Sequence, residues 1–240
     1  MLILAFDTTS DKGGLGVYRD QECLALVPNS GAANLYSISL FEMAELAFSQ
    51  AHLQQADIEL YAVANGPGSF TGIRVGLAAA RAWGRAFSKP VRGVSMLEAL
   101  ANRPRLTSQW AFPILDARRG EFFLGAYLRK TGEIGGRLAT CYEPTNVGWV
   151  LKTGDVGRFF AELLRDGAGG TCVVRAHDLP AFDLAKCLPD SLAWQQVEGT
   201  LVDTVASLAL KAEEEGRADG ASSLDACYIR RPDAEIGWKG

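Results

Sequence analysis

The sequence predicts a duplicated α/β fold with two lobes, and two observations support this prediction. Residues 3–18, ILAFDTTSDKGGLGVY, and residues 112–127, FPILDARRGEFFLGAY, follow the same plan. Each runs from an apolar strand to an Asp, through a polar turn, and along a returning strand to a Tyr. Apolar strand patterns also alternate with helical patterns along the chain, as is typical of α/β domains.

The repeat suggests two related lobes that face each other across a cleft, with one Asp at each rim. We expect the first lobe over residues 1–104 and the second over residues 105–240. A helix over residues 200–216 can pack back on the first lobe. The alternative is two unrelated hairpins that share an Asp by chance.

Composition narrows the function classes. The chain has 240 residues, of which 48% are hydrophobic and 22% charged, as in globular proteins. Its net charge of −4 argues against a protein that binds nucleic acid by itself, since such binding needs clustered Lys and Arg. Five scattered cysteines without Cys-x-x-Cys spacing indicate reduced thiols. We find no signal peptide or membrane-length apolar run, and therefore expect a cytoplasmic protein without membrane contact.

The local patterns then give the elements in order. We expect strands, separated by a polar turn, over residues 2–6 and 15–18, and further strands over 60–64 and 91–94. We expect helices over residues 34–50, 73–87, 97–101, 155–165 and 200–215. Asn34 is the expected N-cap of the first helix, Lys89-Pro90 ends the second and Gly216 ends the last.

A glycine-rich loop, GPGSFTG, joins a strand to a helix at residues 66–72. Backbone N–H groups and the helix N-terminus could hold an anion there. The loop lacks the Gly-Lys-Ser/Thr of a Walker A motif and the Gly-x-Gly-x-x-Gly spacing of dinucleotide sites. A structural loop that lets the helix pack closely on the sheet is an equally good interpretation.

The helix after this loop repeats small residues at every fourth position. Glycine within a helix costs ~1 kcal/mol relative to alanine, so the stripe indicates close approach of a second backbone, from the same chain or from a partner. The helix over residues 34–50 has an apolar arc wider than one core contact needs, which favours a partner. The predicted interface comprises Tyr36, Leu40, Met43, Ala44, Ala47, Gly72, Arg74, Gly76, Ala80 and Gly84.

Candidate catalytic groups are few. Asp7, Thr8 and Asp116 could position a metal–nucleotide between the lobes, or each Asp could cap its own turn. His52 and His177 are far apart, and no pair has metal-ligand spacing. Neither lies beside a nucleophile, as a serine or cysteine hydrolase would require. We therefore predict no catalytic residue, no metal and no cofactor.

Several motifs together resemble those of the bacterial TsaB (YeaZ) family, the tRNA threonylcarbamoyladenosine biosynthesis protein. They are ILAFDTTS, GPGSFTGIRVG, KPVRGVSMLEALA, PILDARRGEFF and YIRRPDAEIGWK, and they extend over essentially the whole chain. The resemblance implies an actin-like fold (ASKHA, ribonuclease H-like) of two lobes. It also implies a place in the machinery that adds threonylcarbamoyl to adenosine 37 of tRNAs reading ANN codons.

The resemblance further implies a scaffold without catalytic activity. The paralogue TsaD holds its metal through His-Leu-Glu-Gly-His, whereas this chain has Met96-Leu97-Glu98-Ala99-Leu100, with apolar residues at both ligand positions. The implied partners are TsaD, as a heterodimer formed through the two helices described above, and the small ATPase TsaE. A homodimer is possible in isolation, and tRNA is contacted only indirectly.

One departure and two alternatives accompany this resemblance. Family members usually carry His-Ser-Glu at the start of the first helix, and this chain has different residues over 34–40, which bears on partner specificity. The first alternative function is an actin-like small-molecule kinase that uses Asp7 and Asp116. The second is a peptidase, which the absence of a metal pair and of a nucleophile–histidine pair disfavours.

Overall fold

The computed structural model describes residues 1–31, 35–103, 106–134, 137–146, 148–164, 169–175, 178, 188, 192–217 and 224–229. Two compact units make up the chain. Unit 1 comprises residues 1–99 and 199–228, and unit 2 comprises residues 100–198 and 229–240. Asn34, the expected helix cap, lies outside the described residues.

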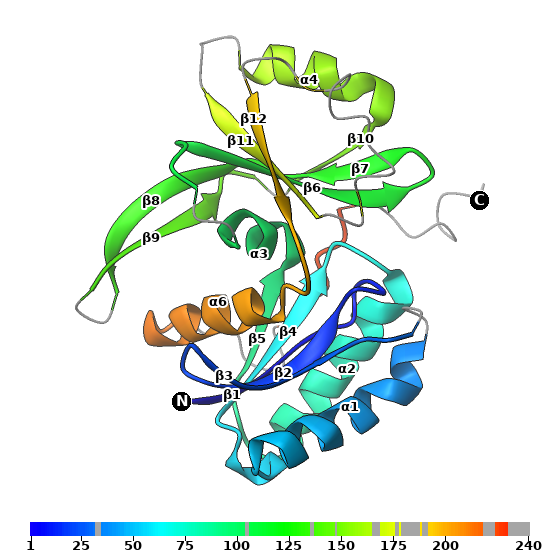
Figure 1. The fold of residues 1–240 in the computed structure, drawn as a ribbon, viewed down its shortest axis with the longest axis vertical. Coiled ribbons are helices and arrows are strands. Elements are labelled where there is room, and N and C mark those ends of the chain that lie inside the picture. Colours follow the sequence, from blue (N-terminus) through cyan, green and yellow to red (C-terminus); the bar gives the residue numbers. More distant parts are fainter. Residues whose placement is uncertain are drawn as a thin grey trace. The chain divides into compact units, whose positions relative to one another are not determined.

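Unit 1 is built on a five-stranded sheet with the order β3-β2-β1-β4-β5 (Figure 1). Its strands are β1 (Leu2–Asp7), β2 (Gly14–Arg19), β3 (Glu22–Pro28), β4 (Leu60–Gly66) and β5 (Val91–Ser95). The first three run antiparallel to one another, and β4 and β5 run parallel to β1. The residues of β1 and β4 are almost all buried, as expected for strands covered on both faces.

Helices cover both faces of this sheet. They are α1 (Tyr36–Ala51), α2 (Phe70–Ala86) and α6 (Val202–Glu214), with a short 3-10 helix, η2 (Gln55–Asp57), before β4. Figure 1 shows α1 and α2 on one face and α6 on the other. Because side chains alternate along a strand, Leu4 and Phe6 join the core under α1 and α2. Ile3 and Ala5, also fully buried, face the side that α6 covers.

Trp83 of α2 is the aromatic centre of the unit 1 core. Its ring lies edge-on to Phe6, with 5.4 Å between centroids, and stacks on Tyr61 at 5.9 Å. On the opposite face, the buried Arg92 of β5 forms an ion pair with Glu213 of α6. This pair fixes α6 on the sheet, because either charge would be costly to bury alone.

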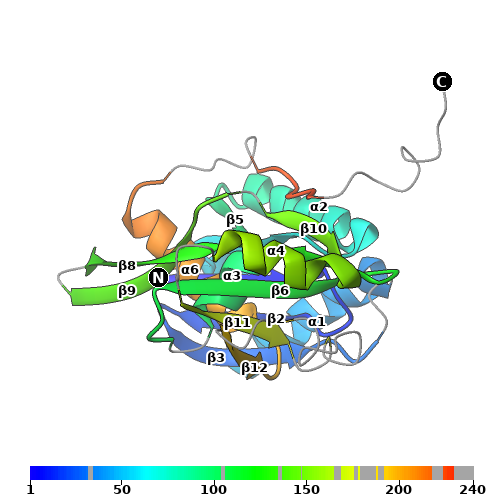
Figure 2. The ribbon, with the colours of Figure 1, turned by 90° about the horizontal axis from the view of Figure 1, so that it is seen from above.

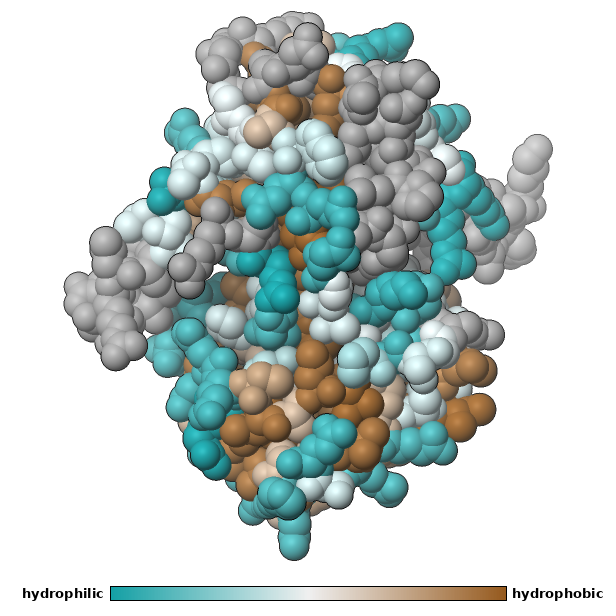
Figure 3. Space-filling view, viewed as in Figure 1, coloured by the Kyte–Doolittle hydropathy of each residue, from teal (hydrophilic) through white to brown (hydrophobic). Residues whose placement is uncertain are grey.

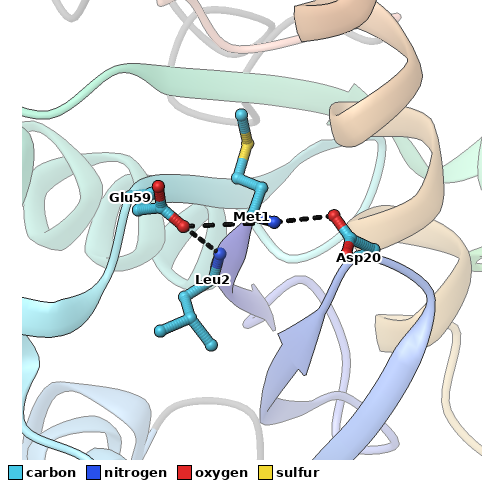
Figure 4. Close-up of polar contacts among 4 residues, drawn as sticks. All are labelled: Met1, Leu2, Asp20 and Glu59. Carbon is cyan, nitrogen blue, oxygen red and sulfur yellow. Dashed lines mark hydrogen bonds and ion pairs between the residues drawn. The ribbon is translucent and has the colours of Figure 1, made fainter.

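The beginning of β1 is held by polar contacts (Figure 4). The α-amino group of Met1 lies 2.7 Å from Asp20 Oδ1, and the Leu2 N–H donates to Glu59 Oε2 at 2.6 Å. Both carboxylates are largely exposed, so these contacts orient the strand more than they stabilise it.

Unit 2 contains a seven-stranded sheet with the path β10-β7-β6-β11-β12, in which β8 pairs with β6 and β9. Its strands are β6 (Trp110–Arg118), β7 (Glu121–Leu124), β8 (Tyr127–Ile134), β9 (Arg137–Pro144), β10 (Trp149–Lys152), β11 (Gly170–Arg175) and β12 (Leu192–Val197). Its helical segments are η3 (Thr153–Asp155) and α4 (Val156–Leu163). Figure 2 shows α4 across one face of this sheet, where Phe160 meets Phe112 at 5.3 Å.

The helix α3 (Met96–Asn102) follows β5, and the two units divide within it, between Ala99 and Leu100. Five of its residues are at most 1% exposed: Met96, Leu97, Ala99, Leu100 and Ala101. Among the described residues, no helix is long and apolar enough to cross a membrane.

Both repeated segments form a strand, a turn and an antiparallel return, as predicted. The second return differs, because it is interrupted between β7 and β8 at Gly125 and Ala126. Gly125 N–H donates to the carbonyl of Pro113, but proline has no N–H to donate in return. The ladder resumes in the same register at Ala111 and Tyr127. The expected single strand to Tyr127 is thus two strands.

Candidate functional site

The turn after β1 is a closed network around a buried carboxylate. Asp7 is 1% exposed, and its Oδ1 accepts hydrogen bonds from the backbone N–H and the hydroxyl of Thr9, both at 2.7 Å. The Thr8 hydroxyl donates to the carbonyl of Gly72 at 2.7 Å, and the Ser69 N–H donates to the carbonyl of Thr9 at 2.7 Å. Asp7 therefore caps its own turn, and this turn is joined to the first residues of α2.

Tyr36 of α1 also contacts this turn. Its hydroxyl donates to the Ser10 carbonyl at 3.0 Å, and the side chain is 1% exposed. Burial, and secondarily the nearby charges of Asp7 and Asp11, raise the pKa of Tyr36. The phenol stays protonated and remains a donor. A Cβ on Gly13 would lie 2.0 Å from the Asp7 carbonyl oxygen, so only glycine fits this turn.

Two of the three glycines of α2, Gly72 and Gly76, are explained by this turn. A Cβ at Gly72 would lie 1.9 Å from the Thr8 carbonyl oxygen, and one at Gly76 would lie 2.4 Å from Thr8 Oγ1. The second backbone that the stripe predicted is therefore the β1–β2 turn of the same chain. A larger residue at Gly76 would therefore disturb folding, and its effect on partner binding could not be interpreted.

Most residues of the predicted interface are buried within unit 1 itself and are not exposed to a partner. Among its ten residues, Arg74 alone is exposed. Four, Gly72, Gly76, Ala80 and Gly84, are buried on the inner face of α2. The other five, Tyr36, Leu40, Met43, Ala44 and Ala47, are at most 7% exposed and belong to the unit 1 core. Small residues and a wide apolar arc indicate close packing, but neither pattern distinguishes packing within the chain from packing against a partner.

A different set of apolar side chains is exposed on α1 and α2, which we call the α1–α2 face: Ile38, Phe41, Leu46, Ala78 and Ala82. On α1, Ile38 is 67% exposed, Phe41 55% and Leu46 48%. The Phe41 ring also lies 5.6 Å from that of Trp83, edge-on, which brings it beside α2. Figure 3 shows apolar surface gathered over the part of unit 1 that α1 occupies in Figure 1. Sequence reasoning missed Ile38 and Leu46, because they lie outside the buried arc.

The two helices of the α1–α2 face carry charges of opposite sign. The only charged residues of α1 are Glu42 and Glu45, both exposed, and those of α2 are Arg74, Arg81 and Arg85. Bulky apolar side chains and acids therefore lie on one helix, and alanines and arginines on the other. Two such surfaces can complement each other.

The second predicted Asp also caps its own turn. Asp116 Oδ1 accepts the backbone N–H of Arg118 at 2.7 Å. Arg118, Arg119 and Gly120 all adopt positive φ, at 64°, 59° and 72°, and all are exposed. This is the β6–β7 hairpin turn of unit 2.

Core residues occupy the two α3 positions that correspond to the metal ligands of TsaD. Met96 and Leu100 of α3 are both fully buried. Within the described part of the chain, no three His, Cys, Asp or Glu side chains gather where they could hold a metal ion. His52 is exposed at the end of α1, and His177 lies outside the described residues.

The two mixed sheets, each begun by a strand–Asp–turn–strand motif, define an actin-like α/β protein of the ASKHA, ribonuclease H-like class. Residues 26–145 match the family described as "TsaD: tRNA N6-adenosine threonylcarbamoyltransferase". The chain belongs to this family, on its TsaB/YeaZ branch.

Individual relatives agree with this membership. The tRNA threonylcarbamoyladenosine biosynthesis protein TsaB of Bacillus subtilis is 32% identical over 132 residues, which cover 55% of this chain and 57% of that protein. The chain thus matches about half the length of its curated relatives.

Two solved structures from Pseudomonas aeruginosa share the fold. One, a protein described as similar to peptidase YeaZ, has a TM-score of 0.73 at 19% identity, over 95% of this chain and 99% of its own. The other, YeaZ, has a TM-score of 0.70 at 20% identity, over 94% and 98%.

Proposed function

We propose that this chain is a non-catalytic partner subunit in the biosynthesis of tRNA threonylcarbamoyladenosine. It binds a TsaD paralogue and, together with the ATPase TsaE, supports transfer of threonylcarbamoyl to adenosine 37 of tRNAs reading ANN codons. Its own contact with tRNA is indirect. The observation that carries the proposal is the exposed α1–α2 face in a chain of the TsaB/YeaZ branch.

The α1–α2 face has the chemistry of a helix–helix contact. Ile38, Phe41 and Leu46 are large apolar side chains that project from a helix whose remaining large apolar side chains are buried. Neighbouring exposed apolar groups of this size on a soluble protein mark an interaction surface. The exposed alanines at 78 and 82 on α2 leave room for a partner helix to approach closely. Aromatic anchors such as Phe41, surrounded by charges, are typical of protein interfaces.

The same face suits a second copy of the chain when the paralogue is absent. A two-fold axis would bring α1 of one copy against α2 of the other. Glu42 and Glu45 would then meet the arginines of α2, and Phe41 would meet the alanines. We therefore expect a weak homodimer that the paralogue displaces, since both use one face.

The proposal of a non-catalytic role rests on the α3 segment. Thioether and aliphatic groups at Met96 and Leu100 cannot replace imidazole ligands of a metal, and both side chains are fully buried in the core. Catalysis is therefore assigned to the paralogue.

The decisive experiment replaces Phe41 by Glu and measures binding to the co-expressed paralogue by isothermal titration. We expect at least a tenfold loss of affinity, because a charge would be buried against an apolar contact. The matched control is Leu163→Glu on α4, where a leucine is 40% exposed on another helix. The control should bind normally, and both variants should keep the circular dichroism spectrum. Normal binding by the Phe41 variant would contradict the interface.

The alternative functions have their own tests. A kinase that used Asp7 and Asp116 would bind Mg-ATP and transfer phosphate, and a peptidase would release fragments from a labelled peptide. We expect neither from the pure chain. We expect depletion of the chain in cells to lower threonylcarbamoyladenosine in total tRNA, measured by mass spectrometry of nucleosides, and the Phe41→Glu variant not to restore it.

A further inference from the structure

A short segment near the C-terminus is fastened along α2 and the end of β4. We call residues Leu224–Tyr228 the strap. Leu224 is 3% exposed and belongs to the core cluster, and its carbonyl accepts a hydrogen bond from Arg81. The Asn65 side chain donates to the Asp225 carbonyl at 3.1 Å, and the Cys227 N–H donates to the Asn65 carbonyl at 2.8 Å. The strap is thus attached to the rest of unit 1 by both side-chain and backbone hydrogen bonds, and Figure 2 shows its trace, in red, beside α2.

The sheet beneath has glycine where the strap passes. A Cβ at Gly93 of β5 would lie 2.8 Å from Leu224 Cδ1. A Cβ at Gly66 of β4 would lie 2.8 Å from the Cys227 carbonyl oxygen. Glycine in a strand marks the close approach of another group, so the strap is part of the packed structure of unit 1.

At its end, the strap holds an exposed arginine. The Tyr228 ring lies 5.3 Å from that of Phe70, and the Arg74 guanidinium lies 3.8 Å above the Phe70 ring. Arg74 Nε also donates to the Tyr228 hydroxyl at 3.3 Å. A surface arginine normally loses side-chain freedom on binding a partner. Arg74 has been ordered in advance by stacking and by a hydrogen bond.

Arg74 is one of three arginines in a line. Because residues of an α-helix are ~100° apart, positions 74, 81 and 85 fall within ~40° of one another on α2. None of the three forms an ion pair with a residue that the structure describes. The strap contacts two of them, Arg74 and Arg81. The row lies on α2 beside the alanines of the α1–α2 face, so the two surfaces are continuous.

We propose that the strap pre-orders Arg74 and Arg81 as anchors for a carboxylate-bearing face of the partner protein, with Tyr228 as the positioning residue. The inference rests on the proposed function and extends its interface from the α1–α2 face to the C-terminal segment. A row of guanidinium groups that form no ion pair within the described part of the chain, next to an apolar contact, fits acidic side chains at the rim of a protein interface.

The test is a double-mutant cycle on the full chain, with affinity for the co-expressed paralogue measured at low and high salt. We expect Arg74→Gln to weaken binding about tenfold and Tyr228→Ala about fivefold. If Tyr228 acts through Arg74, adding Tyr228→Ala to Arg74→Gln should change the affinity less than twofold. The loss caused by Arg74→Gln should shrink at high salt. Arg158→Gln on α4 is the matched control and should have no effect.

The outcomes separate the two proposals. If Phe41→Glu weakens binding but Tyr228→Ala does not, the strap inference fails and the proposed function stands. If neither Phe41→Glu nor Arg74→Gln weakens binding, the proposed interface itself fails. If Arg74→Gln reduces tRNA retention in a gel-shift assay and leaves paralogue binding unchanged, the row serves RNA and the acidic protein face is wrong. If Tyr228→Ala proves unstable, Tyr228→Phe takes its place, because it keeps the stacking on Phe70 and loses only the hydroxyl. An affinity between those of the wild type and of Arg74→Gln would then support the strap inference.

Discussion

The hairpins β1–β2 and β6–β7 are built on one plan and have different surroundings. In both, an Asp at the end of the first strand accepts the N–H two residues further on, at 2.7 Å. Asp7 is 1% exposed, and its turn is covered by the first residues of α2. Asp116 is only partly buried, and its turn is exposed.

The difference shows that the local motif determines the chain reversal, whereas the tertiary contacts determine which substitutions the turn tolerates. The Asp and the polar turn suffice to reverse the chain in both units, because the carboxylate satisfies a turn N–H. What the turn tolerates depends on what packs against it. The first turn is held by a glycine helix and a buried phenol, whereas the second tolerates three successive residues at positive φ. Substitutions should therefore affect the two turns very unequally.

The largest effect is expected from Gly72→Ala in the covered turn. The new Cβ would lie 1.9 Å from the Thr8 carbonyl oxygen, a backbone atom that cannot rotate away. We expect a loss of about 4 kcal/mol in the free energy of unfolding, or no folded protein at all. Denaturant titration followed by circular dichroism measures it.

The control for this change is Gly154→Ala, where nothing lies within 4 Å of the added Cβ. It should alter the free energy of unfolding by less than about 0.5 kcal/mol. Equal stability of the two variants would show that α2 moves away from the turn easily, and the contrast between the hairpins would disappear.

A smaller effect is expected when each Asp is replaced by Ala. Asp7→Ala removes an acceptor of two buried hydrogen bonds, so we expect a loss of about 2–3 kcal/mol. Asp116→Ala removes one partly exposed bond, and a loss of about 1 kcal/mol is expected. Thermal unfolding of the two variants gives the ranking. A larger loss at Asp116 would mean that burial does not set the value of the shared motif.

Much of this arrangement could be predicted from the sequence, because it depends on local patterns. The repeated segments gave both hairpins, and the spacing of Gly72 and Gly76 gave the close approach. The sequence could not predict whether the approaching backbone belongs to this chain or to a partner. A glycine stripe has the same spacing whether it packs against Thr8 or against another protein. The exposure of Ile38 on α1 also depends on which helix face the sheet covers.

The strap was missed for a related reason. Its attachments join Asp225 and Cys227 to Asn65, which is more than 150 residues away in the chain. No periodicity in the tail marks that pairing. The interruption at Gly125 is different, because it follows from Pro113 on the neighbouring strand. Local chemistry would have predicted it once the register was known.

The smallest effect is expected in the open turn, at Arg118. Its φ of 64° lies in the left-handed region, which costs an ordinary L-residue roughly 1 kcal/mol and is much easier for asparagine. Arg118→Asn should therefore raise the stability of unit 2 by about 0.5 kcal/mol, measured as the midpoint of urea unfolding followed by tryptophan fluorescence. A substitution in the covered turn has no such opportunity, because its residues are held by tertiary contacts. If Arg118→Asn instead destabilises the unit by 1 kcal/mol or more, the guanidinium contributes more than the strain costs, and the second turn is not as permissive as its exposure indicates.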